Sequence, residues 1–172
     1  MQKTFKMSAQ PDFFKQFRRN IFIETGSGYG DGIQMALNAG FNKIYSIELS
    51  KLMYNNCLQK FKDNSKVNLI FGNSVEILPL ILSSINEPVT FWLDAHCSGG
   101  DTVGGATPPL MNELHVIGKH HIKEHTILID DLRSWGELYV NLLANKILNI
   151  NPHYRIIFAD GSTPDDILIA KI

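Results

Sequence analysis

The chain has 172 residues, of which 44% are hydrophobic, and this length and composition predict one globular domain over residues 1–172. Its formal net charge is −1 and its pI is about 6.6, which argues against a nucleic-acid backbone as the main partner. Cys57 and Cys97 are too few for a disulfide framework, and no apolar run suits a signal peptide or a membrane span, so we expect a cytoplasmic protein without a membrane partner.

A glycine-rich turn follows the first predicted strand. Residues 1–20 are expected to form a short N-terminal segment and helix, and the β-rich run 21–25 then enters the glycine-rich stretch 26–30. A helical pattern follows from Ile33. Glycines allow the backbone to approach a ligand closely, so this strand, turn and helix predict a nucleotide-binding loop.

A second β-rich run, 43–48, ends at Glu48, about twenty positions past the first glycine. A carboxylate at this position can accept hydrogen bonds from both hydroxyls of a ribose. The spacing does not fit a dinucleotide, because both registers of the G-x-G-x-x-G pattern require a glycine where Asp31 or Ile33 stands. The alternative for Glu48 is a solvated charge at the start of a helix.

Helix-like and strand-like segments alternate along the rest of the chain. The predicted helices cover residues 50–62, 74–82, 110–120 and 136–148, and the predicted strands cover 67–71, 89–93, 126–129, 154–159 and 167–172. Ser50 and Ser74 are expected to cap the first two of these helices. Residues 160–165 have the composition of a turn, so the last two strands are expected to form a hairpin.

Every candidate functional residue lies at the carboxyl end of a predicted strand. Near-continuous apolar strands indicate a sheet covered on both faces, and ligands bind such sheets beyond the carboxyl ends of the strands. The residues in these positions are Glu24 to Gly30, Glu48, Asn73 with Ser74, Asp94, and Asp130 with Asp131.

Glu24, two positions before Gly26, together with Gly28 and Gly30, resembles the first motif of the class I S-adenosylmethionine (SAM) methyltransferases. The alternating elements and the final hairpin extend the resemblance over nearly the whole chain from Phe13 onward. It implies an α/β fold with a Rossmann-like, doubly wound sheet of seven strands, mostly parallel, with an antiparallel C-terminal strand. The alternative is a glycine-rich turn in another kind of α/β protein.

The resemblance also implies where SAM would bind. The glycine turn would hold the methionine end, Glu48 the ribose hydroxyls, and Asn73 with Ser74 would border the adenine. The expected cofactor-binding residues are Glu24, Gly26, Ser27, Gly28, Gly30, Glu48, Leu49, Asn73, Ser74 and Asp94.

Three aspartates predict a metal site. Asp94, Asp130 and Asp131 follow strands that should be neighbours, and three like charges this close are unfavourable unless a cation or protons neutralise them. A hard cation such as Mg²⁺ fits this set. The pattern resembles the metal-dependent, catechol O-methyltransferase-like branch of the family. The alternative is that Asp94 binds the SAM amino group and Asp131 only caps the turn toward Trp135.

His96 and Asp94 are the candidate catalytic residues. His96 stands where a general base could reach an acceptor, and its usual pKa suits that task. In the resembled branch a lysine occupies this neighbourhood, so the base assignment and a catechol-type acceptor stay open. The glycine-rich stretch 96–109 is expected to act as a flap over the acceptor. The other histidines lack the spacing of a zinc site.

These observations predict an enzyme, a SAM-dependent methyltransferase that uses a metal to methylate a hydroxyl group of a small-molecule or sugar-like metabolite. The acceptor would be recognised by the loops of this domain or by a partner subunit, as in a homodimer. Two alternatives remain open. One is a non-catalytic SAM-binding module, and the other is a metal-dependent hydrolase that uses the aspartate cluster.

Overall fold

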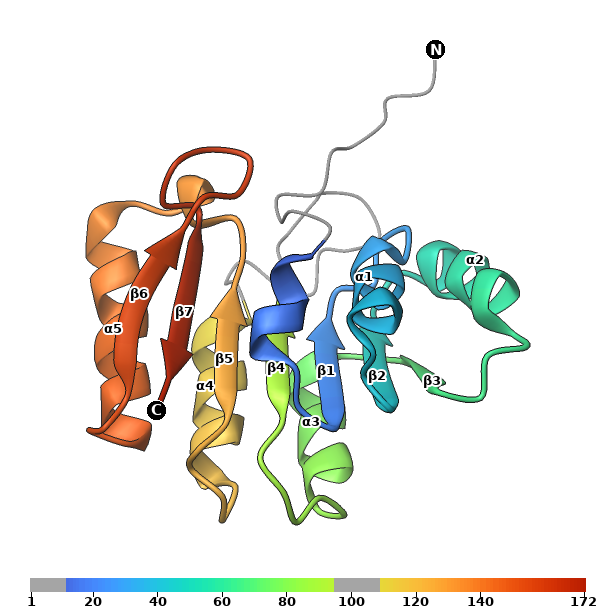
Figure 1. Cartoon of the computed structure of the whole chain (residues 1–172), viewed down its shortest axis with the longest axis horizontal. Helices are drawn as coiled ribbons and strands as arrows, with labels where there is room; N and C mark the ends of the chain where they lie inside the picture. Colours follow the sequence, from blue (N-terminus) through green and yellow to red (C-terminus); the bar gives the residue numbers. More distant parts are fainter. Residues whose placement is uncertain (1–11, 95–108) are drawn as a thin grey trace.

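The computed structural model describes residues 12–94 and 109–172. Within these ranges the chain forms one sheet of seven strands with helices on both faces (Figure 1). The strands are β1 (Ile21–Thr25), β2 (Lys43–Glu48), β3 (Val67–Phe71), β4 (Thr90–Leu93), β5 (Thr126–Ile129), β6 (Arg155–Ala159) and β7 (Ile167–Lys171). The helices are η1 (Phe13–Phe17), α1 (Asp31–Ala39), α2 (Lys51–Phe61), α3 (Ser74–Leu82), α4 (Leu110–Lys119), η3 (Leu132–Ser134) and α5 (Glu137–Ile150). No helix in the described ranges has the length and apolar character needed to cross a membrane.

The strand order in the sheet is β3-β2-β1-β4-β5-β7-β6. The pairs formed among β1 to β5 are parallel, whereas β7 runs antiparallel to β5 on one side and to β6 on the other. The hairpin of β6 and β7 therefore inserts its second strand next to β5. The predicted Rossmann-like, mostly parallel sheet with an antiparallel C-terminal strand is confirmed.

Two hydrophobic clusters cover the two faces of the sheet. One contains side chains of α3, α4 and α5, packed against Ile23, Phe91 and Ile127. The other contains side chains of η1, α1 and α2, packed against Phe22 and Trp92. Neighbouring residues of one strand enter different clusters because side chains alternate along a strand. Burial on both faces explains the near-continuous apolar runs of the sequence.

The phenylalanines before β1 belong to the core. Phe13, Phe14 and Phe17 of η1 are buried. The ring of Phe14 lies 4.9 Å, centroid to centroid, from the rings of both Phe22 and Trp92. Such tilted and edge-on pairs are favourable aromatic geometries. The three phenylalanines therefore pack against the sheet as part of the core.

Side chains cap the two helices that follow β2 and β3. Ser50 accepts a hydrogen bond from the N–H of Met53 at 3.4 Å and is the predicted cap of α2. At α3 the prediction of Ser74 is wrong by one residue, because the Asn73 side chain accepts from the N–H of Val75 at 3.0 Å. Asn and Ser favour this position about equally, so the sequence alone does not separate them.

The amino edge of the sheet holds a buried histidine pair. The N–H of Val89 donates to Nδ1 of His125 at 3.1 Å, so a neutral His125 ring carries its proton on Nε2. That nitrogen donates to Nδ1 of His120 at 2.9 Å, and Nε2 of His120 donates to the carbonyl of Ile85 at 3.0 Å. Burial lowers the pKa of His125 to about 3. These bonds hold the pair as neutral parts of the fold.

Candidate functional site

The parallel strands bring the predicted site residues to one edge of the sheet. After β1, β4 and β5, one backbone hydrogen bond to a neighbouring strand holds the first residue of the following loop. The N–H of Gly26 donates to a carbonyl of β2 at 2.9 Å, that of Asp94 to β1 at 3.1 Å, and that of Asp130 to β4 at 3.2 Å. The glycine turn, the first aspartate and the aspartate pair are therefore held in line across the carboxyl edge, where the strand order reverses between β1 and β4.

The glycine turn after β1 depends on left-handed backbone geometry. Gly26, Gly28 and Gly30 have φ angles of 83°, 49° and 78°, a region that favours glycine. A Cβ on Gly30 would lie 2.6 Å from the ring of Phe61, whereas a Cβ on Gly28 would meet no atom within 4 Å. Gly30 thus allows the turn to pack on α2, and Gly28 borders open space in which a ligand can approach the backbone.

Glu48 holds this turn in place. One of its carboxylate oxygens accepts from the N–H of Gly28 at 2.9 Å, and the other accepts from the N–H of Ser50 at 2.7 Å. Each oxygen keeps lone-pair capacity for a further donor. The predicted ribose-binding carboxylate thus lies between the glycine turn and α2, and Leu49 beside it is exposed.

Glu24 lies inside the fold beneath the turn. Its Oε2 accepts a hydrogen bond from the hydroxyl group of Ser46, and the Ser46 and Ser27 hydroxyl oxygens are 2.5 Å apart. Its Oε1 packs so closely on Gly32 that a Cβ there would lie 1.8 Å away. Burial raises the pKa of Glu24 to about 8, and the bond from Ser46 offsets only part of this. In the structure Glu24 therefore supports the glycine turn from the interior.

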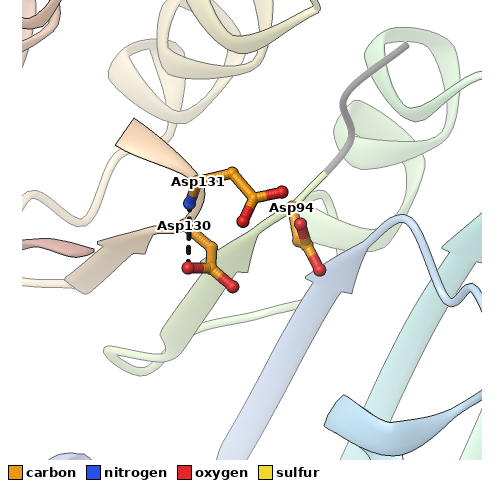
Figure 2. A group of neighbouring side chains, drawn as sticks. All are labelled: Asp94, Asp130 and Asp131. Carbon is orange, nitrogen blue, oxygen red and sulfur yellow. Dashed lines mark hydrogen bonds between the residues drawn. The ribbon is translucent and has the colours of Figure 1, made fainter. Parts of the chain in front are cut away.

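Asp94, Asp130 and Asp131 converge at the ends of β4 and β5 (Figure 2). Each offers one carboxylate oxygen, and these three oxygens all lie within 4.8 Å of one another. The predicted adjacency of the two strands, on which this convergence depends, is confirmed. The N–H of Asp131 donates to Oδ1 of Asp130 at 2.8 Å, and Asp131 has a left-handed φ of 60°. This turn directs the carboxylates of Asp130 and Asp131 toward that of Asp94.

An ion-pair network holds the outer aspartate. Arg133 lies 2.7 Å from Oδ1 of Asp131 and also pairs with the buried Asp166. Asp166 accepts from the backbone N–H groups of Arg133 at 3.0 Å and Ser162 at 2.9 Å. Asp131 occupies the N-cap position of η3 without a side-chain cap bond. The alternative in which Asp131 only caps this turn is therefore not what the structure shows.

Glu113 is a site neighbour that the sequence reasoning missed. It is fully buried on α4 and accepts a hydrogen bond from the hydroxyl group of Ser74. Within the described ranges its Oε2 makes no hydrogen bond. Burial raises the pKa of Glu113 to about 7, the hydroxyl groups of Ser74 and Thr25 lower it in part, and the charge of Asp94 raises it further. A signal did exist, because Glu113 shares the helix face of Leu110, Leu114 and Ile117.

Two predicted features lie wholly or mainly outside the described residues. His96, the candidate base, falls in the undescribed stretch 95–108, which also contains nearly all of the expected flap. Trp135, which lies within the described ranges, is half-buried, and its ring lies 5.1 Å from that of Tyr139. The structure therefore places the cofactor-binding and metal candidates at one edge and leaves the base assignment a prediction.

No protein-family model and no curated protein matches this chain. Solved structures do share its fold. The O-methyltransferase from Bacillus cereus in complex with S-adenosylhomocysteine (SAH) gives a TM-score of 0.67 at 11% identity, covering 92% of this chain and 76% of that one. The SAH-bound methyltransferase from Podospora anserina gives a TM-score of 0.62 at 12% identity, with 92% and 74% covered.

Spermidine synthase from Thermotoga maritima also shares the fold, with a TM-score of 0.65 at 13% identity over 95% of this chain. The match covers 57% of the synthase, so this chain spans little more than half of that protein's length. At identities this low the likeness shows the architecture, and a fold of this kind hosts more than one chemistry. The chain has the fold of the class I methyltransferases.

Proposed function

We propose that this protein is a SAM-dependent methyltransferase that methylates a hydroxyl group of a small-molecule or sugar-like metabolite with the help of a divalent cation. One observation carries the proposal. A glycine turn open to a ligand and three aspartates whose oxygens lie within 4.8 Å of one another meet at the same edge of the sheet. The SAH-bound structures that share the fold support the cofactor.

The cofactor side of the proposed site uses the ends of β1, β2 and β3. Glu48 would accept the ribose hydroxyls with its remaining lone pairs, and the open space at Gly28 would admit the methionine end. Asn73 and Ser74 would border the adenine. Glu24 would act from within, by keeping the turn in shape.

The donor set fits a hard divalent cation. Three carboxylates supply only oxygen ligands, and Mg²⁺ typically combines a few of these with water or substrate oxygens. Asp94, Asp130 and Asp131 would hold the ion, while Arg133 keeps one oxygen of Asp131 in an ion pair. A cation bound there would lower the pKa of an acceptor hydroxyl and help to align it.

The acceptor side must also take up a proton. When the methyl group passes from the sulfonium sulfur to an acceptor oxygen, the sulfur keeps the electron pair of the broken bond and the hydroxyl proton leaves. Asp94 borders both halves of the site, and His96 is proposed as the general base. Trp135 would form an apolar wall of the acceptor pocket.

A cytoplasmic location, a homodimer and the lack of nucleic-acid or membrane partners belong to the same proposal.

Mass spectrometry of the purified protein tests the cofactor, and we expect retained SAM or SAH. A labelled-methyl screen over hydroxyl-bearing acceptors, with Mg²⁺ or with excess chelator, tests the reaction. We expect label transfer with Mg²⁺ and a loss of at least ~100-fold in chelator. Full activity in chelator would remove the cation from the proposal.

Asp130→Asn tests the aspartates without altering the backbone. It removes one charge from the cluster, so Mg²⁺ affinity should fall at least ~10-fold by calorimetry while SAM binding persists. Asp63→Asn is the matched control, since Asp63 is exposed and lies far along the chain from the cluster.

The same measurements distinguish the alternative functions. SAM binding without transfer to any acceptor would favour a non-catalytic module. Metal-dependent hydrolysis without SAM binding would favour the hydrolase.

A further inference from the structure

The Arg133 side chain links two aspartates that have different surroundings. Its Nη1 lies 2.7 Å from Oδ1 of Asp131 and also donates to Oδ2 of Asp166. Asp131 belongs to the aspartate cluster at the ends of β4 and β5, whereas Asp166 immediately precedes β7. Because an arginine in a folded protein does not lose its proton, these two carboxylates share one permanent positive charge.

Asp166 is the buried and firmly held member of this pair. Its side chain is 0% exposed, and its carboxylate also accepts from the backbone N–H groups of Arg133 at 3.0 Å and Ser162 at 2.9 Å. A buried carboxylate that loses its cationic partner is strongly destabilising, so Asp166 retains Arg133. The guanidinium group is therefore kept beside the aspartate cluster.

Arg133 supplies Asp131 with the kind of charge that a bound cation would supply. The carboxylate oxygens of the cluster lie within 4.8 Å of one another and are stabilised by positive charge nearby. Arg133 contributes part of that charge through its contact with Asp131. A divalent cation at the cluster would lie close to this guanidinium group. Like charges at such short range repel strongly near a protein surface, where water screens them only in part.

Two effects of Arg133 on cation binding have opposite signs. Its contact with Asp131 helps to orient a ligand, whereas its charge repels the ion. Backbone hydrogen bonds already hold the turn, because the N–H of Asp131 donates to Asp130 at 2.8 Å. The N–H groups of the next two residues, Leu132 and Arg133, both donate to Asp166. The orienting effect is thus the smaller one, and the repulsion decides the sign.

We propose that Arg133 competes with the divalent cation for Asp131, and that Asp166 keeps Arg133 in position to do so. The inference rests on the proposed cation-assisted function and concerns how tightly the ion is held. The cation would bind weakly to the protein alone. It would bind more tightly once a negatively charged acceptor oxygen joins its ligands and offsets the charge of Arg133.

Calorimetry with Mg²⁺, and with Mn²⁺ as a second probe, tests the competition. Arg133→Gln removes the charge but keeps an amide that can donate to a carboxylate. We expect this variant to bind either ion at least ~10-fold more tightly than the wild type. Its melting temperature in excess chelator should fall by at least ~3 °C, because the aspartates lose their counter-charge. A merely structural role of Arg133 would lower both quantities.

Arg133→Lys separates the charge from the shape of the side chain. Lysine keeps the positive charge but lacks the planar guanidinium group, so ion affinity should stay within about threefold of the wild type. Arg155→Gln is the matched control for loss of an arginine. Arg155 is exposed and pairs with Lys171, at the other end of the hairpin from Asp166. This control should keep the wild-type ion affinity.

The outcomes separate this inference from the function on which it rests. Unchanged or weaker ion binding by Arg133→Gln overturns the inference, and so does a tenfold loss in Arg133→Lys. Circular dichroism checks that each variant folds, and Arg133→Lys decides alone if Arg133→Gln does not. If neither the wild type nor any folded variant binds an ion, the proposed cation site itself is wrong. That result differs from equal binding by all of them, which removes only the competition.

Discussion

Both edges of the sheet bury titratable side chains, but the two edges differ in how completely these side chains are hydrogen-bonded. At the amino edge, every ring nitrogen of His120 and His125 has a hydrogen bond. At the carboxyl edge, one oxygen of Glu113 has no hydrogen-bond partner among residues 12–94 and 109–172, and three aspartates converge. Unpaired buried groups and clustered like charges cost free energy that a ligand can offset. The candidate site thus lies at the edge where, among the described residues, a buried carboxyl oxygen has no hydrogen bond.

Gly32→Ala should disturb the carboxyl edge most. A Cβ at this position would lie 1.8 Å from Oε1 of Glu24, and that carboxyl group is buried and bonded to Ser46. We expect a loss of at least ~3 kcal/mol in the free energy of unfolding, measured with urea. Gly136→Ala is the control, because a Cβ there would meet no atom within 4 Å. Similar stabilities of the two variants would show that Glu24 can move aside.

His125→Ala should disturb only the amino edge. The change leaves the N–H of Val89 and the ring of His120 without their partner and opens a small cavity. We expect a loss of about 2 kcal/mol in the free energy of unfolding. SAM affinity, measured by calorimetry, should stay within about twofold of the wild type. His153→Ala, at an exposed position, is the control. A large drop in SAM affinity would mean that the edges are coupled.

Glu48→Ala should weaken SAM binding while leaving the amino edge intact. The variant loses the carboxylate that is proposed to accept the ribose hydroxyls and that holds Gly28. We expect a loss of about 1.5–3 kcal/mol in binding free energy, or more than tenfold in affinity by calorimetry. Glu137→Ala, an exposed glutamate of α5, is the control. Unchanged affinity would remove Glu48 from the cofactor site.

The two edges should also differ in how the free energy of unfolding depends on pH, with smaller effects than those of the substitutions above. Burial lowers the pKa of His125 from 6.5 to about 3, so between these values the unfolded chain binds the extra proton and stability falls as pH falls. Burial raises the pKa of Glu24 from 4.5 to about 8, so between these values the folded chain holds the extra proton and stability falls as pH rises. Each slope approaches ~1.4 kcal/mol per pH unit.

Thermal melts from pH 4 to pH 8 check these slopes. His125→Ala should remove the slope on the acid side and keep the other. Glu24→Gln, which stays neutral at every pH, should remove the slope between pH 7 and 8 and keep the first, while Glu113, with its pKa raised to about 7, still contributes below pH 7. The same change of profile in both variants would contradict the assignment of one group to each edge.

The fold was predictable because its strands are buried on both faces. The apolar runs 43–48, 67–71 and 126–129 match β2, β3 and β5 to the residue. The turn 160–165 indicated the hairpin, and the observed pairing of β6 with β7 confirms it. Convergence of the three aspartates was also predictable, because parallel neighbours end at the same edge.

The rest of the site depends on contacts between segments far apart in the sequence. Ser74 meets Glu113 through the packing of α3 beside α4, and Arg133 meets Asp166 through the hairpin turn. No local pattern specifies such partners. Among these residues, only Glu113 could have been identified from the sequence, because it is an acidic residue at a core position of its helix. The raised pKa of Glu113 follows from burial, which requires the tertiary structure.

The insertion of β7 has a consequence for folding. One side of β5 is covered by β4, while its other side pairs with β7, and α5 and β6 come between them in the sequence. Asp166, which anchors Arg133, immediately precedes β7. During synthesis Leu132 and Arg133, which follow the aspartate pair, therefore lack their contacts with Asp166 until β7 has emerged and docked. Among the seven strands, the one made latest is the one that completes the candidate site, and because its pairing with β5 is non-local we expect this step to be slow.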